Sequence, residues 1–350
     1  MLVGINYPWI NYGWDFGDPP PAWVADCDLP EWRERKRTQI DDDFRGFASQ
    51  GIFAVRWFLL GDGTNYGIDA YAPRETNDGW TADPLPAGHP VHDQIREDFT
   101  FILETCSKHN LKLFPSLIDF PWCQEGMAVA GNRGIIKGGR HDIIRNADKR
   151  RAFLERVLDP LLDVSVRYAD SIYAWELINE PEWVVRKLSL FGEKNKNKPL
   201  SREAMKDFIR EGTRRINRRL DSKGRSAFRS SVGFAHWNSL GRWDAQALGI
   251  TLAQFHYYAQ GNRSLPRHSQ LTACPCVVGE FATAAAREWP DLRPTGQRVT
   301  DRIACAEDRG YEACFLWSAR AADEATCWTD QEQQETLVYT RPRRSGDFRA

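Results

Sequence analysis

The feature that most constrains the fold is a regular alternation of short apolar segments with longer amphipathic ones along the 350 residues. Eight segments are rich in β-branched and aromatic residues, and several of them are almost continuously apolar. Such runs are typical of strands that are buried on both faces of a parallel sheet. The predicted strands are 2–7, 52–59, 112–118, 172–178, 228–234, 252–258, 276–281 and 313–318.

The segments between these strands carry apolar residues at helical spacing. In 91–108, Val91, Ile95, Phe99, Leu103 and Cys106 recur at steps of three and four residues. The predicted helices are 31–49, 91–108, 149–168, 202–221 and 296–309. Because eight strands alternate with helices, the sequence predicts a (β/α)8 barrel, or TIM barrel.

The connections support this interpretation, because the turns into the strands are short and the segments after several strands are long. About thirty residues follow the second strand, about thirty follow the third and about twenty follow the fourth. In a barrel these long loops lie at the C-terminal face, where barrel enzymes have their active sites. We therefore expect residues 1–350 to form one catalytic domain, with a polar segment from roughly 320 to 350 that makes a poor eighth helix.

Charge and hydropathy exclude several classes of partner. The chain has 47 Lys and Arg against 48 Asp and Glu, a net charge of −1, so no overall field favours nucleic acid or an anionic membrane. No stretch approaches the roughly 20 apolar residues that span a bilayer, and no export signal is recognisable. We expect a protein of the cytoplasm, or a secreted one whose signal has been removed, and the sequence sets no oligomeric state.

Three motifs that could bind other ligands fail in their context. Residues 61–67 contain three glycines, but the third is one position late for a dinucleotide fingerprint and no helix follows. His89 and His92 have no companions that would complete a zinc site, and the arginines of 202–221 are typical of a solvated helix face. We expect no cofactor and no metal. The eight cysteines lack metal-ligand spacing and are interpreted mainly as buried free thiols, with disulfides as the alternative.

Two glutamates mark the ends of two otherwise apolar strands. Glu180 ends the fourth strand and Glu280 ends the seventh, where a buried polar group needs a reason. Strands four and seven face each other across a barrel mouth, so the two carboxylates can converge. A pair of carboxylates whose environments push their pKa values apart is what the hydrolysis of a glycosidic bond requires. The alternative is that either glutamate is a surface loop residue or half of a salt bridge.

Around these residues the sequence resembles the clan A glycoside hydrolases, and most closely family 5, the cellulase and β-mannanase family. The resemblance extends from the first strand to the eighth, and its most specific motif is Asn179-Glu180-Pro181. It implies that Glu180 is the general acid/base, that Asn179 hydrogen-bonds the sugar 2-hydroxyl, and that Glu280 is the nucleophile.

Further positions match the family pattern and also have a physical interpretation of their own. Arg56 lies in an apolar run and can stay charged only beside a partner, so it either holds Glu280 ionised or forms a structural ion pair. On the sixth strand, Tyr258 can donate to the nucleophile and His256 can orient the acid/base or bind sugar. Trp317 on the eighth strand offers a flat floor for a pyranose ring, with core packing as the alternative.

One position departs from the family pattern. Family 5 members generally carry a His at the end of the third strand, whereas this chain reads Leu-Ile-Asp-Phe-Pro-Trp over 117–122. Asp119 and Trp122 are therefore the candidate substrate contacts or supporting residues at that strand end.

The aromatic content supplies further candidates, since the chain holds 14 Trp, 18 Phe and 10 Tyr. Tryptophan rings stack on flat apolar faces such as those of sugars, but they also fill protein cores. Trp57 and Trp175 lie inside strands and are expected to serve the barrel. The tryptophans at or just after strand ends suit sugar stacking and core or rim packing equally, and these are Trp9, Trp122, Trp183 and Trp237.

These features predict a retaining β-glycoside hydrolase that acts by double displacement on β-linked glucan, mannan or shorter β-linked oligosaccharides. Retaining sites hold their carboxyl groups ~5–5.5 Å apart, whereas inverting sites leave ~6.5–9.5 Å for a water molecule. Two alternatives stay open: a carbohydrate-binding barrel without catalysis, and a transglycosidase of the same fold.

Overall fold

The computed structural model describes residues 1–8, 17, 29–66, 71, 73–129, 135–186, 198–220, 224, 226–258, 265–282, 298–320 and 327–340. Eight parallel strands are hydrogen-bonded in the order β10-β11-β12-β1-β2-β5-β8-β9. They are β1 (Leu2–Asn6), β2 (Ala54–Phe58), β5 (Lys112–Ile118), β8 (Trp175–Asn179), β9 (Ser230–Gly233), β10 (Ala253–Tyr257), β11 (Cys276–Ala282) and β12 (Ala313–Trp317). A parallel bridge between Phe234 and Phe255 joins β9 to β10 and closes the barrel. The predicted (β/α)8 barrel is confirmed.

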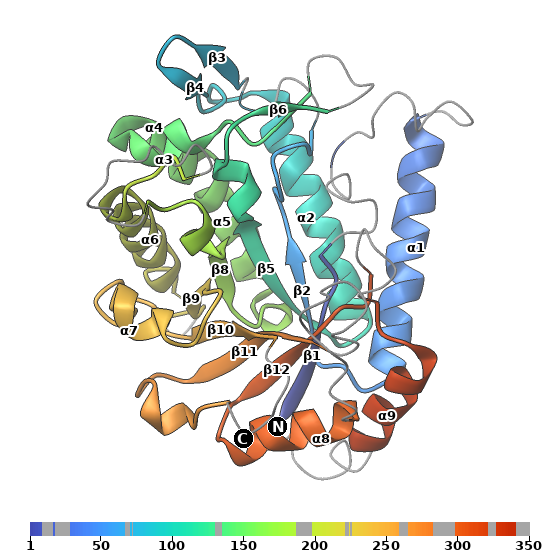
Figure 1. The fold of residues 1–350 in the computed structure, drawn as a ribbon. Helices are drawn as coiled ribbons and strands as arrows, with labels where there is room; N and C mark the ends of the chain where they lie inside the picture. The colour runs from blue at the N-terminus through green and yellow to red at the C-terminus, as the bar shows by residue number, and fades with distance from the viewer. Residues whose placement is uncertain are drawn as a thin grey trace.

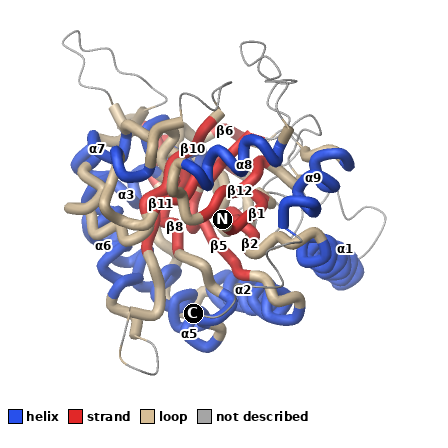
Figure 2. The backbone as a smooth tube through the Cα atoms, turned by 90° about the horizontal axis from the view of Figure 1, so that it is seen from below, coloured by secondary structure: helices blue, strands red, loops and turns tan. Residues whose placement is uncertain are grey.

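Helices surround the strands on the outside of the barrel (Figures 1 and 2). The helices that follow β1, β2, β8 and β9 are α1 (Leu29–Ser49), α2 (Pro90–Lys108), α6 (Arg202–Asn217) and α7 (Ser239–Trp243). Those that follow β11 and β12 are α8 (Val299–Asp308) and α9 (Asp330–Thr340). Between β10 and β11, the residues that are described form only a 3-10 turn, His268–Gln270.

The segment after β5 is helical but interrupted. It contains α3 (His141–Arg145), α4 (Ala147–Phe153), a π-helical turn (Leu154–Leu158) and α5 (Asp159–Arg167), where the sequence predicted one helix over 149–168. Pro160 explains the π turn. Its ring lacks an N–H and would clash with the carbonyl of Arg156 in a regular helix, so the preceding turn widens.

The barrel interior is filled in layers. Its lower part is apolar, with Phe114, Phe315 and Val277 among fully buried side chains. Above them, toward the carboxyl ends of the strands, lies a buried polar layer made by Asn6, Arg56, Ser116, Glu176, Ser231 and Gln254. Between strands and helices lies a second apolar core, and it includes the fully buried Trp57 and Trp175, as predicted. The polar layer carries the catalytic candidates on its upper side.

The C-terminal segment corrects an expectation, because residues 330–340 form the regular helix α9. Thr329 and Glu332 make a reciprocal capping box: the Glu332 side chain accepts from the Thr329 N–H at 2.8 Å, and the Thr329 hydroxyl accepts from the Glu332 N–H at 3.2 Å. The hydroxyl of Thr340 donates to the carbonyl of Gln50 at 2.8 Å. Polar anchors therefore hold a helix whose weak apolar pattern had indicated a poor eighth helix.

The long loops after β2 and β5 are locked together at the carboxyl end of the barrel. They carry two small hairpins, β3 (Arg74–Thr76) with β4 (Gly79–Thr81) and β6 (Met127–Ala128) with β7 (Ile136–Lys137), which lie at the top of Figure 1. The buried guanidinium of Arg140 donates to the carbonyls of Gly63 and Gly138. Gly63 has a φ of 89°, and a Cβ there would overlap that guanidinium. The glycine-rich motif thus serves a contact between loops.

No helix among the described residues is long and apolar enough to cross a membrane. Cys106, Cys123, Cys276 and Cys314 are buried free thiols, and Cys274 is a partly buried one. The interpretation as buried free thiols is confirmed for the first four, and Cys27 lies outside the described residues.

Candidate active site

Arg56 organises the polar layer at the barrel mouth. Its Nε and Nη2 donate to the two carboxyl oxygens of Glu176, each at 2.7 Å. Nη1 donates to Asn6 Oδ1 at 2.8 Å and to Glu280 Oε1 at 2.9 Å, and Nη2 also donates to Asn179 Oδ1 at 2.7 Å. All five guanidinium N–H groups therefore have acceptors, which a lysine could not match.

Glu176 is the main counter-charge of this arginine. It has no exposed surface and also accepts from Ser116 Oγ at 2.9 Å and from Gln254 Nε2 at 2.8 Å. Burial alone lowers the pKa of Arg56, but the ion pairs with Glu176 and Glu280 outweigh burial and raise that pKa above its usual value. Arg56 is therefore a fixed positive charge beneath Glu280.

Glu280 lies within β11, at a place where the register with both neighbouring strands shifts. Its Oε2 accepts a hydrogen bond from the Tyr258 hydroxyl at 2.5 Å, and its Oε1 accepts from Arg56. Burial and the negative charge of Glu280 raise the pKa of Tyr258 well above its usual value, so the phenol stays a donor. Two donors thus fix the orientation of the Glu280 carboxyl group.

Glu180 directly follows β8 and adopts the left-handed conformation, with φ 44° and ψ 55°. A non-glycine residue pays roughly 1–3 kcal/mol for such a backbone, which is commonest at functional sites. Its Oε2 accepts from the indole Nε1 of Trp183 at 2.7 Å. Burial raises the pKa of Glu180 to about 7, although the Trp183 hydrogen bond acts in the opposite direction. A protonated carboxyl is therefore well populated at neutral pH.

His256 bridges the two glutamates. Its Nδ1 lies 2.7 Å from Glu180 Oε1 and 3.4 Å from Glu280 Oε2. Burial lowers the pKa of His256 to about 4, so the ring is neutral at neutral pH. Its buried Nε2 has no hydrogen-bond partner among the described residues. An unpaired buried N–H is costly, so the tautomer with the proton on Nδ1, facing both carboxyl groups, is favoured.

The amide of Asn179, the last residue of β8, lies beside this cluster. It accepts from Arg56, as described, and its Nδ2 donates to Asp119 Oδ1 at 2.9 Å. The structure thus brings together Arg56, Asp119, Asn179, Glu180, His256, Tyr258 and Glu280, seven of the residues that the sequence had singled out.

The candidate tryptophans differ in exposure and in the residues that they contact. Trp317 ends β12, is partly exposed and pairs in register with Ala282 of β11. Trp183 and Trp237 are 44% and 41% exposed, and Trp183 is bound to Glu180. For Trp122 the core-packing alternative is confirmed and the stacking alternative is wrong, because its side chain has no exposed surface. Its ring packs between Tyr71 and Phe153 in the core. Trp9 lies outside the described residues.

Three residues of the polar layer were not among the candidates from the sequence. Asn6 holds Arg56 from one side, Glu176 from the other, and Gln254 supports Glu176. Glu176 and Gln254 are polar residues inside otherwise apolar strands, and Asn6 is the polar last residue of β1. That signal was present in the sequence and would have found them.

Glu180, His256 and Glu280 also bring one possible metal-ligand atom each to within 4.8 Å of one another. The arrangement opposes a cation, however, because the positive charge of Arg56 lies 2.9 Å from Glu280 Oε1 and burial favours the protonated form of Glu180. Hydrogen-bonded proton transfer is the chemistry that this cluster supports.

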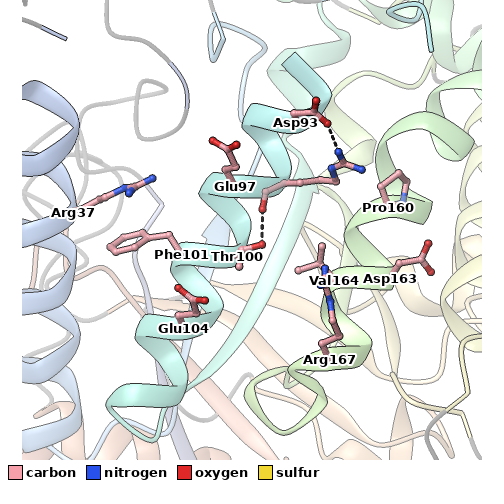
Figure 3. Close-up of a pocket in the computed structure, with 11 residues that line it drawn as sticks. Arg37, Asp93, Glu97, Thr100, Phe101, Glu104, Pro160, Asp163, Val164 and Arg167 are labelled. Atoms are coloured by element: carbon pink, nitrogen blue, oxygen red, sulfur yellow. Dashed lines mark hydrogen bonds and ion pairs between the residues drawn. The ribbon is translucent and has the colours of Figure 1, made fainter. Parts of the chain in front are cut away.

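An open groove of about 730 Å³ lies elsewhere, on the outer wall between α2 and α5 and facing α1 (Figure 3). Its charges are mixed: Arg96 pairs with Asp93, and Arg37 lies over the Phe101 ring at 5.0 Å. The groove holds no convergent catalytic set and is separate from the barrel mouth.

The fold is similar to that of solved β-mannanases, although no protein-family model and no curated protein sequence matches the chain. An endo-1,4-β-mannanase from Eisenia fetida is 19% identical, with a TM-score of 0.65 over 97% of this chain and 91% of that one. A β-mannanase from the blue mussel Mytilus edulis is 16% identical, with a TM-score of 0.66 over 99% and 92%. A β-1,4-D-mannanase from Cryptopygus antarcticus is 16% identical, with a TM-score of 0.67 over 97% and 90%. The chain therefore has the barrel fold of these enzymes along almost its whole length.

Proposed function

We propose that this protein is a retaining β-glycoside hydrolase, similar to clan A family 5, that cleaves β-linked mannan, glucan or shorter β-linked oligosaccharides. The observation that carries the proposal is the separation of the two glutamates, since a carboxyl oxygen of Glu180 and one of Glu280 lie within 4.8 Å. This spacing is close to the ~5–5.5 Å of retaining pairs and well below the ~6.5–9.5 Å of inverting pairs.

The environments of the two carboxyl groups suit opposite roles. Glu280 accepts hydrogen bonds from Arg56 and Tyr258, which aim its carboxyl group as a nucleophile requires. Glu180 has a pKa of about 7 and can carry a proton at neutral pH, as a general acid requires.

In the first step, a carboxylate oxygen of Glu280 attacks the anomeric carbon. The bond to the leaving oxygen breaks, and that oxygen takes the proton of Glu180. In the second step, water attacks the anomeric carbon while the Glu180 carboxylate takes a proton from it, and the ester bond to Glu280 breaks. Both glutamates return to their starting states, and the product keeps the β configuration.

The remaining candidates have places around a sugar ring in this proposal. Asn179 hydrogen-bonds the 2-hydroxyl, and Trp317 offers a stacking face. Trp183 supplies an exposed ring beside the acid/base, and Trp237 supplies a second exposed ring. Because the similar solved structures are β-mannanases, β-mannosides are the first substrates to assay, followed by β-glucosides and β-galactosides.

A 2-deoxy-2-fluoro glycoside with a good leaving group tests the proposal. The expected result is a stoichiometric covalent adduct, located on Glu280 by peptide mass spectrometry. Sugar binding without adduct or turnover would instead indicate a carbohydrate-binding barrel. Adduct formation followed by transfer to a sugar acceptor rather than to water would indicate a transglycosidase.

A further inference from the structure

The amide of Asn179 lies between two groups that fix which way it faces. On one side, Arg56 Nη2 donates to Asn179 Oδ1 at 2.7 Å. On the other, Asn179 Nδ2 donates to Asp119 Oδ1 at 2.9 Å. A guanidinium can only donate, so the carbonyl oxygen of the amide must face Arg56 and its NH2 group must face Asp119. One N–H of Asn179 is used by Asp119, and the second has no acceptor among the described residues, so it is available to a ligand.

Asp119 is itself fixed by the backbone around it. Its N–H donates to the carbonyl of Gly61 at 3.0 Å, and its own carbonyl accepts from the Trp122 N–H at 3.0 Å. Its Oδ1 also accepts from the Phe120 N–H at 2.7 Å. The acceptor atom that Asn179 contacts is therefore held by the loop after β2 and by the 3-10 turn Phe120–Cys123.

Burial raises the pKa of Asp119 well above its usual value, and the nearby charges of Glu180 and Glu280 act in the same direction. A neutral carboxyl still has a carbonyl oxygen that accepts two hydrogen bonds. Asp119 can thus hold the amide without adding a further buried negative charge beside the two glutamates.

We propose that Asp119 is a positioning residue, which holds the amide of Asn179 so that a free N–H points to the 2-hydroxyl of the bound sugar. The inference rests on the proposed function and adds the reason why an aspartate can stand at this strand end. Asp119 acts through an acceptor oxygen, so an amide at this position can replace it, whereas a side chain without an acceptor cannot.

Asp119→Asn and Asp119→Leu separate these cases when each is assayed on two aryl β-glycosides, one with the 2-hydroxyl and its 2-deoxy counterpart. The Asn variant is expected to retain kcat within about threefold on both substrates. The Leu variant is expected to lose about 10- to 100-fold in kcat on the hydroxylated substrate, as for other misplaced polar contacts. On the 2-deoxy substrate it should stay within about threefold of the wild type, because the contact is absent there.

Asp62→Leu is the matched control. Asp62 is also a buried aspartate, but it lies on the loop after β2 and hydrogen-bonds Thr64 rather than Asn179. This control variant should change kcat by the same factor on both substrates. If Asp119→Leu does not fold, as judged by thermal unfolding, Asp119→Ala replaces it in the same comparison.

An equal loss of kcat on both substrates in the Leu or Ala variant would overturn the inference. A loss of kcat in the Asn variant as large as that in the Leu variant would overturn it as well. A wild type that cleaves neither substrate and forms no adduct would overturn the proposed function instead.

Discussion

The hydrogen bond from Trp183 to Glu180 should set the alkaline limit of activity. Trp183→Phe keeps an aromatic ring but removes the N–H that donates to Glu180 Oε2 at 2.7 Å. This donor stabilises the carboxylate form and lowers the pKa of Glu180, which burial otherwise raises, to a net value of about 7. Its removal must therefore raise that pKa, so the acid keeps its proton to higher pH.

The size of the change follows from the strength of the bond. A hydrogen bond to a charged group contributes about 1.5–3 kcal/mol, and one pKa unit corresponds to 1.36 kcal/mol, so complete loss would shift the pKa by about 1–2 units. The Trp183 side chain is 44% exposed, so water can replace part of the lost hydrogen bond. We therefore expect an upward shift of roughly 0.5–1 unit.

The pH dependence of kcat/KM measures this shift, because it reports the ionisation of the free enzyme. The substrate should have a poor leaving group, whose departure needs the proton of Glu180. In the wild type the rate should fall as pH rises through about 7, and in Trp183→Phe the fall should begin at higher pH. With a dinitrophenyl leaving group, which needs no proton, the alkaline fall should be weak in both proteins.

Trp237→Phe is the matched control. Trp237 is 41% exposed and follows the neighbouring strand, and within the described part of the chain its indole makes no hydrogen bond to Glu180. The alkaline fall of kcat/KM in this variant should coincide with that of the wild type. If kcat/KM of Trp183→Phe falls at the same pH as in the wild type or at a lower pH, the reasoning is refuted. An equal upward shift in Trp237→Phe would refute it too.

Three further perturbations test the site and its frame. Glu280→Ala should reduce turnover below detection yet keep the far-UV circular dichroism spectrum of the wild type, because Arg56 retains its bidentate partner Glu176. Turnover by this variant at the wild-type rate would disprove the nucleophile role of Glu280. Arg56→Met should lower the free energy of unfolding in urea by about 3–5 kcal/mol, since it leaves Glu176 buried without a counter-charge, and a loss under 1 kcal/mol would contradict this. Gly63→Ala should cost more stability than Gly88→Ala, because both have positive φ but only the first would place a Cβ on the Arg140 guanidinium. Equal melting temperatures of the two variants would count against the loop contact.

The sequence predicted the barrel and the central pair of the site because each left a direct physical signal. Strands covered on both faces must be apolar throughout, so their positions were visible. A glutamate at the end of such a strand is expensive to bury, which directed attention to Glu180 and Glu280. The same reasoning applied inside the strands would have found Glu176 and Gln254, whose burial is complete.

Other features depend on packing between distant segments, which local patterns do not contain. Trp122 and Trp183 both follow strand ends, yet one packs against Tyr71 and Phe153 while the other reaches Glu180. Only the path of the loops after β2 and β5 distinguishes them. The helix α9 was missed for a different reason. Its apolar pattern is weak, and the capping box that marks its start, although visible in the sequence, was not considered.

The stereochemistry of the first product tests the central claim most directly. Proton NMR can follow the anomeric signals during the first minutes of cleavage of a β-glycoside, before the free sugar equilibrates. Two carboxyl groups whose oxygens approach within 4.8 Å predict that the β-anomer forms first and the α-anomer appears only by mutarotation. Initial formation of the α-anomer would show inversion and would contradict the proposed mechanism.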